Sequence, residues 1–214
     1  MNPYTYRLAF AAALVLASGL ASGTDDGAWR AAILRRDAAA VAALVVQGAD
    51  VNRAGRDGMT ALMVAAARHD HALLSNLLAR GARVSATNDR GGTALMYATT
   101  AGDEEGVRLL LRAGANVDAR ASNGWTALTL CAALGHDRIA ADLLARGADP
   151  NLADVYGWTP LMRAVEQERE TVVRVLLADP RTSLDARDEN GLTALGHARE
   201  LKLDAIARQL RARR

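Results

Sequence analysis

The stretch Gly124-Trp125-Thr126-Ala127-Leu128 decides the fold, because it recurs along the chain at a fixed interval. Its counterparts begin at Gly58, Gly91, Gly157 and Gly191, and the five threonines are 33, 33, 33 and 34 residues apart. A second marker, Gly-Ala, recurs with a period of 33 residues at Gly48-Ala49, Gly81-Ala82, Gly114-Ala115 and Gly147-Ala148. Two markers in phase indicate an internal repeat, which is typical of a solenoid.

Each period reads as two helices joined by a turn and followed by a hairpin. The glycine can take the positive φ of a tight turn, and the threonine two residues later can cap the free N–H groups of a helix. Apolar residues then fall at helical spacing, as at Leu74, Leu77 and Leu78, before the Gly-Ala that ends the second helix. One unit cannot bury both faces of its helices, so neighbouring units must stack.

The segments Gly-x-Thr-(Ala/Pro)-Leu and Leu-Leu-x-x-Gly-Ala resemble the ankyrin repeat. The resemblance covers residues 25–214 and implies an all-α fold, an ankyrin-repeat solenoid of about six helix-turn-helix units with short β-hairpin connections. Within a domain of residues 24–214 we expect units at about 25–54, 55–87, 88–120, 121–153, 154–187 and 188–214.

The terminal units differ from the others, as capping units do. The first has Gly27-Ala28-Trp29-Arg30 where the others have the threonine segment. The last ends in Arg208, Arg211, Arg213 and Arg214, which we expect to solvate an exposed face and to interact with the negative end of the final helix. A basic docking patch is the alternative.

Two departures from the family pattern carry expectations about packing. Where ankyrin repeats usually have histidine, this chain has Met63, Met96, Thr129, Met162 and Gly196, so we expect a looser stack. In the fifth unit Asp179-Pro180 stands where Gly-Ala is expected, and proline requires a φ near −65°. The sequence therefore predicts a local kink or bulge between units five and six.

Residues 1–23 have the layout of a cleaved signal peptide. Arg7 precedes the apolar run Leu8–Ala17, and small residues follow up to Gly23. This run is well short of the roughly 20 residues that span a bilayer as a helix, so we expect export without stable membrane insertion. A periplasmic location is predicted, with secretion as the alternative. Cys131 is the single cysteine, so no internal disulfide can form.

Composition argues against several classes of function. The chain has 26 basic and 24 acidic residues, mixed along its length, for a formal net charge of +2. No field of one sign builds up, so a nucleic-acid partner is not indicated. Phosphate-binding, dinucleotide-binding and nucleophile-elbow motifs are missing from the sequence, and we expect no enzyme activity and no cofactor.

The cysteine and the histidines, which are the candidates for catalysis or metal binding, are each expected to have a structural role instead. Cys131 occupies a small-residue position of a first helix and is expected to be a packed, inert thiol. His69-Asp70-His71 is expected to be a solvated turn rather than a metal site, because residues two apart do not share a helix face. His136 and His197 are expected to support a turn and the capping unit.

The resemblance implies that a partner binds the concave face, lined by hairpin tips and first helices. Trp125, Tyr156 and Trp158 lie at adjacent expected hairpins, outside the expected core, and Trp and Tyr are common interface anchors. The alternative is that the tryptophans lie flat across the hairpins and hold the stack together. The candidate surface comprises Met59, Arg90, Tyr97, Trp125, Tyr156, Trp158, Arg163, Glu166 and Leu192.

We therefore expect a monomeric, exported scaffold that binds another protein. An antidote, inhibitor or regulator of a partner enzyme or toxin is the alternative, and it predicts a tight one-to-one complex. A hydrolase that uses His69 or His136 ranks last, because the repeat gives no reason to expect a pocket.

Overall fold

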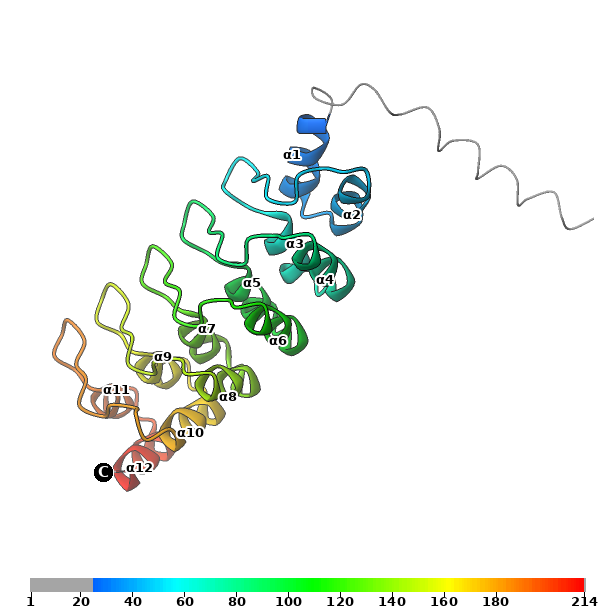
Figure 1. Ribbon diagram of the computed structural model, residues 1–214. Helices are drawn as coiled ribbons and strands as arrows, with labels where there is room; N and C mark the ends of the chain where they lie inside the picture. The colour runs from blue at the N-terminus through cyan, green and yellow to red at the C-terminus, as the bar shows by residue number, and fades with distance from the viewer. Residues whose placement is uncertain (1–24, 214) are drawn as a thin grey trace, which may run out of the picture.

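The computed structural model describes residues 25–213 and shows an elongated stack of helix pairs (Figure 1). The helices are α1 (Asp25–Arg35), α2 (Ala38–Val46), α3 (Ala61–Ala67), α4 (His71–Ala79), α5 (Ala94–Ala101), α6 (Glu104–Arg112), α7 (Ala127–Leu134), α8 (Asp137–Ala145), α9 (Pro160–Glu166), α10 (Glu170–Ala178), α11 (Ala194–Glu200) and α12 (Asp204–Ala212). The predicted all-α repeat solenoid is confirmed. The expected signal peptide at residues 1–23 lies outside the described residues.

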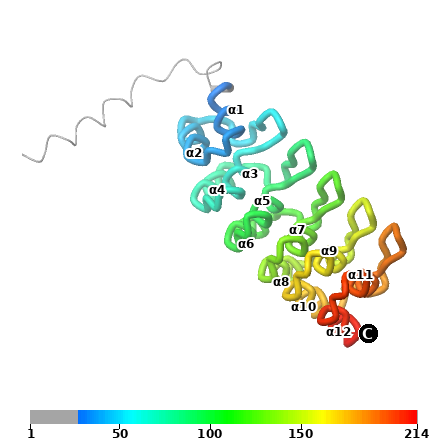
Figure 2. Tube along the Cα trace, turned by 180° about the vertical axis from the view of Figure 1, so that it is seen from behind, coloured from blue at the N-terminus to red at the C-terminus, as the bar shows by residue number. Residues whose placement is uncertain are grey.

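The stack has two helical layers and a row of projecting hairpins (Figures 1 and 2). The first helices of successive units lie side by side, the second helices form the other layer, and the hairpins all project to the same side. We call the surface formed by the hairpins and the first helices the hairpin face.

A threonine begins five of the first helices, as predicted. In α7 the hydroxyl of Thr126 accepts a hydrogen bond from the backbone N–H of Thr129 at 3.2 Å. The same cap occurs at Thr60, Thr93, Thr159 and Thr193. These helices have only seven or eight residues, so satisfying an exposed N–H matters for each of them.

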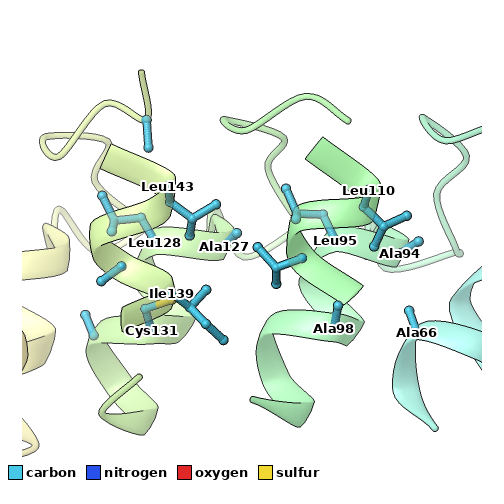
Figure 3. Close-up of a cluster of buried hydrophobic side chains, with 14 of the residues drawn as sticks. Ala66, Ala94, Leu95, Ala98, Leu110, Ala127, Leu128, Cys131, Ile139 and Leu143 are labelled. Carbon is cyan, nitrogen blue, oxygen red and sulfur yellow. The ribbon is translucent and has the colours of Figure 1, made fainter. Parts of the chain in front are cut away.

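The core runs between the two helical layers along the whole stack. Small side chains such as Ala98 and Ala127 let first helices approach closely, and leucines from the second helices, such as Leu110 and Leu143, fill the space behind them (Figure 3). Cys131 lies among these residues and is fully buried, as predicted. Met63, Met96 and Met162 stand at the position where the family has histidine, and all three are buried.

Backbone hydrogen bonds join each hairpin to the next. The N–H of Ser122 donates to the carbonyl of Arg90 at 2.9 Å, and the N–H of Val155 donates to the carbonyl of Asn123 at 3.2 Å. The equivalent bonds join Asp89 to Asp57 and Glu189 to Tyr156. Within residues 25–213 the hairpins form no regular strands, apart from one isolated bridge between Thr87 and Thr93. The connections are therefore turns that hydrogen-bond along the stack.

The turn between units five and six differs from the others, at the place where the sequence predicted a kink. After α10, Asp179 takes an extended conformation with φ −80° and ψ 119°, where the other second helices end close to the helical region. The Thr182 hydroxyl donates to the carbonyl of Leu176 at 2.7 Å, and the Arg181 guanidinium reaches the carbonyl of Leu144. The Thr182 hydroxyl thus satisfies a carbonyl at the end of α10, where a glycine turn usually does so, whereas Arg181 reaches back to the end of α8.

The two ends of the stack are finished differently. We expected Arg213 to interact with the end of the final helix. Its guanidinium instead donates to the carbonyls of Leu177 and Asp179 at the end of α10. At the other end Leu34 is 79% exposed and Val46 is 74% exposed. Trp29 is fully buried, unlike the aromatic residues of the hairpins. Its indole N–H donates to the carbonyl of Arg53 and ties α1 to the first hairpin.

Candidate partner-binding surface

Asp154 organises the hairpin face at unit five. Its side chain is fully buried, and its Oδ1 accepts backbone N–H donors from Tyr156 at 2.9 Å and from Trp158 at 3.0 Å. Its Oδ2 accepts from the Arg163 guanidinium and from the Trp125 indole N–H, the latter at 3.2 Å. One carboxylate therefore connects the hairpin of unit four, the hairpin of unit five and helix α9.

Four side chains form a stacked column along the hairpin face. The Arg163 guanidinium lies 5.4 Å from the centre of the Trp125 ring and 4.5 Å from the centre of the Trp158 ring. The rings of Trp158 and His197 have their centres 4.3 Å apart. The column Trp125, Arg163, Trp158, His197 thus links units four, five and six through cation–π and ring contacts.

The carboxylates at the column are held in the charged form. Burial opposes ionisation of Asp154, but hydrogen bonds from Arg163 and from the N–H groups of Tyr156 and Trp158 outweigh it, so its pKa lies below the usual value. For Asp188 burial is likewise outweighed, by the N–H groups of Leu192 and Asn190 and by His197, and its pKa is also lowered. Both carboxylates are paired, so neither is available to a solvent-exposed ligand.

Trp125, Trp158 and Arg163 come together as a group, and the contacts fit both interpretations that the sequence left open. The two tryptophans are half-buried and support the stack through the column, while part of each ring stays accessible. Arg163 keeps only 15% of its side chain exposed, and it also pairs with Glu166 at 3.0 Å. The column is therefore a support that also presents aromatic surface.

The remaining predicted residues are more spread out. Tyr156 is 54% exposed at its hairpin tip, and Arg90 is exposed two hairpins away. Tyr97 is half-buried on α5, where its hydroxyl accepts from the Asn88 side chain at 2.9 Å, and Leu192 is half-buried beside α11.

Met59 does not belong to this surface. Its side chain is 2% exposed and packs in the core cluster, so it cannot contact a partner. It was predicted because it stands between glycine and threonine, like Trp125 and Trp158. A flexible, unbranched methionine at this position turns into the core, whereas the broader indole rings stay at the surface.

The sequence pattern did not identify three residues of the site, Val155, Asp154 and Asp188. Val155 is 59% exposed beside Tyr156 and adds apolar area to the hairpin tip. The two aspartates were missed because acidic residues before a turn are usually read as turn formers. The signal that identifies them is the polar residue nine positions later on the first helix of the same unit, Arg163 or His197.

The two histidines of the turn at 69–71 have a neighbour that the sequence did not reveal. Asp103, from the next unit and 4% exposed, accepts from His71 Nε2 at 2.7 Å, and His69 Nδ1 lies 3.9 Å from the same carboxylate. The pair is a contact between units two and three. No group of three or more His, Cys, Asp or Glu side chains within the described ranges is arranged to hold a metal ion.

The chain matches a known protein family. A family model described as ankyrin repeats, in three copies, matches residues 29–121, 73–154 and 114–188. A search of curated proteins finds no match. Of the helices formed by residues 25–212, none has both the length and the apolar character needed to cross a bilayer.

Proposed function

The chain belongs to the ankyrin-repeat family, whose repeats bind other proteins, and on that premise we propose that it is an exported scaffold that binds a periplasmic or secreted protein through its hairpin face. The observation that carries the proposal is the exposed apolar tip formed by Val155 and Tyr156. These side chains are 59% and 54% exposed, beside two half-buried tryptophans. Exposed aromatic surface on a pre-formed support is typical of an interface anchor.

The partner surface that fits this site is apolar and uncharged. Asp154 and Glu166 neutralise the one cation of the column, Arg163, and the two exposed side chains Val155 and Tyr156 carry no charge. We expect the affinity to change less than about threefold between 0.05 and 0.5 M salt, because apolar burial is not screened by ions. A steep loss of affinity with added salt would point to a charged interface instead.

Capture of partners with a matched pair of variants tests the surface. The test variant carries Val155→Ser and Tyr156→Ser, which remove exposed side chains without touching the column. The control carries Val46→Ser, which removes an exposed apolar side chain from the far end of the stack. A protein held by wild type and control but lost by the test variant identifies the site and the partner. Equal capture by all three would exclude this surface.

The same partner decides between a passive scaffold and a regulator. If the captured protein is an enzyme or toxin, titration with this chain should show whether activity falls to zero at one equivalent. Stoichiometric inhibition supports an antidote or inhibitor, and unchanged activity supports a scaffold. Light scattering of the purified protein should give the mass of a monomer.

Export rests on the sequence of residues 1–23. The charged Arg7, the apolar run Leu8–Ala17 and the small residues that follow favour cleavage after Ala21 or Gly23. Mass spectrometry of the protein recovered from the cell envelope tests this, and we expect a mature chain that begins at Ser22 or Thr24. A mature chain that retains Arg7 would contradict cleavage and leave the stack tethered.

A further inference from the structure

Three hairpins share a side-chain arrangement that the family assignment does not explain. Asn88, Asp154 and Asp188 each accept two backbone N–H donors of their own turn with Oδ1. The second polar atom of each side chain binds the residue nine positions later, on the first helix of the same unit. The bound residues are Tyr97 (2.9 Å), Arg163 and His197 (2.8 Å).

The residue types at the hairpin position and at the helix position nine residues later change together from unit to unit. Where the first helix carries a polar side chain that needs a partner, the hairpin carries Asn or Asp. Where the first helix carries Leu130 or Val64, the corresponding hairpin position is Ala121 or Gly55. The side chain before the turn therefore matches the chemistry of the side chain on the helix.

The hairpins do not need this residue in order to close. In units two and four, which have glycine and alanine at the position, the turn is closed by Asp57 and Asn123, which accept from the N–H groups of Met59 and Trp125. These hairpins also join the row of hydrogen bonds along the stack. The contact with the helix residue is thus an addition to the turn.

We propose that Asn88, Asp154 and Asp188 are positioning residues for the partner-binding surface, each holding the side chain nine residues later against its own hairpin. The inference rests on the proposed function of the hairpin face, because two of the held residues, Tyr97 and Arg163, belong to that surface. Asp154 holds Arg163 between Trp125 and Trp158, and Asp188 holds His197 against the Trp158 ring. The aromatic surface is then fixed before a partner arrives, which lowers the entropy lost on binding.

Side-chain NMR signals test the arrangement without a partner. Asp154→Asn keeps an oxygen for the turn N–H groups but removes the charge that Arg163 binds. We expect the Arg163 Nε–H signal to be lost to exchange with water and the Trp125 indole N–H signal to shift. The Trp29 indole signal should stay in place, because its hydrogen bond to the Arg53 carbonyl is far from the change. An unchanged Arg163 signal would overturn the proposal.

A double-mutant cycle separates positioning from simple support of the turn. In wild type, Asp154→Asn should raise the unfolding equilibrium constant by about tenfold or more, whereas in an Arg163→Met background it should raise it by about threefold or less. Equal effects in the two backgrounds would show that Asp154 serves only its turn. If Asp154→Asn alone is too unstable to measure, a folded double variant with Arg163→Met would still show that the two side chains are coupled, and an equally unfolded double variant would contradict it.

Affinity for the captured partner provides the functional readout. The Asp154 side chain is fully buried and cannot touch a partner. We nevertheless expect Asp154→Asn to weaken binding by about tenfold, since the column loses its fixed geometry. Unchanged affinity would overturn the positioning role while leaving the proposed surface intact. Equal capture by the Val155 and Tyr156 variant would refute the surface and leave the NMR result unaffected.

Discussion

At the scale of single residues, buried carboxylates determine many of the side-chain contacts within and between the units of this stack. Asp103, Asp154 and Asp188 are each 6% exposed or less, and each bonds a cation, a histidine or backbone N–H groups. Buried acids are tolerated only when they are paired. Their partners lie in the same unit or the preceding one, so these residues define which side chains meet.

Asp188 gives stability that depends on pH. Its pKa is lower in the folded chain than in the unfolded chain, because the N–H groups of Leu192 and Asn190 and the His197 ring outweigh burial. The contribution is therefore complete above the unfolded pKa, about 4, and is lost as pH falls through the folded pKa. We expect Asp188→Asn to lower the unfolding free energy by about 2 kcal/mol at pH 7 and by progressively less in acid.

Urea unfolding at several pH values between 2.5 and 7 measures this difference. Glu189→Gln is the control, because it removes an exposed carboxylate from the next position, and it should change the unfolding free energy by less than about 0.5 kcal/mol at pH 7. A difference between wild type and Asp188→Asn that stays constant down to pH 2.5 would contradict the assignment.

The Cys131 thiol should be unreactive in the folded protein. Burial raises the pKa of the Cys131 thiol, so the reactive thiolate is scarce at neutral pH, and the side chain is fully buried. We expect a thiol reagent such as dithionitrobenzoate to label the protein only at the rate of unfolding, and immediately in 6 M guanidinium. Rapid labelling under native conditions would show that α7 opens locally.

At the scale of elements, the turn between the two helices of a unit requires a left-handed residue. Gly135 takes it with φ 89°, whereas Glu168 takes it with φ 55° in the next unit. A side chain in this conformation costs about 1 kcal/mol relative to glycine. We expect Glu168→Gly to raise the unfolding free energy by about 0.5–1 kcal/mol in denaturant titrations. Gly135→Ala should lower it, and a stabilising effect of that reverse change would refute the explanation.

The end of α10 depends on an arginine from the last unit. Arg213 donates to the carbonyls of Leu177 and Asp179, at 2.7 and 3.1 Å. We expect Arg213→Ala to lower the unfolding free energy by about 1 kcal/mol, measured by thermal or urea unfolding. Arg211→Ala, two residues away and exposed, is the matched control. Equal effects of the two substitutions would favour a general charge effect over a helix-end contact.

The helices and turns could be predicted where residues close in sequence determine their start, end or buried face. The threonine caps, the glycine turns and the apolar spacing of the second helices follow from residues close in sequence, and all are found in the structure. The close of α10 was only partly predictable. Proline at 180 shows that glycine geometry is excluded, but the donors to the end of α10, Thr182 and Arg213, are fixed by side-chain packing.

At the scale of the whole molecule, the stack should open from its ends. The amino-terminal unit lacks the threonine cap and exposes Leu34 and Val46, whereas units three and four pack against a neighbour on both sides. We expect amide hydrogen exchange to be fastest in α1 and α2 and slowest in α5 to α8. Uniform protection along the chain would indicate all-or-none opening instead.

The candidate surface was predictable in position but not in its internal contacts. The period places Trp125 and Trp158 at equivalent points of adjacent hairpins, and it places Arg163 and His197 on adjacent first helices. That an arginine from one unit lies between rings of two units depends on the distance between units, which no local pattern gives. The prediction that Met59 lies on the surface was wrong for a related reason. The position between glycine and threonine faces the surface or the core according to the side chain it carries.

The stacked column also limits how this array can change length in evolution. Repeat proteins gain and lose units by duplication and deletion of whole periods. A new unit between the fourth and fifth, or between the fifth and sixth, would separate Trp125 from Arg163 or Trp158 from His197. A unit inserted between the third and fourth would leave both pairs adjacent. The column therefore makes units four to six a block that is kept or lost together, and growth of the array should occur outside it.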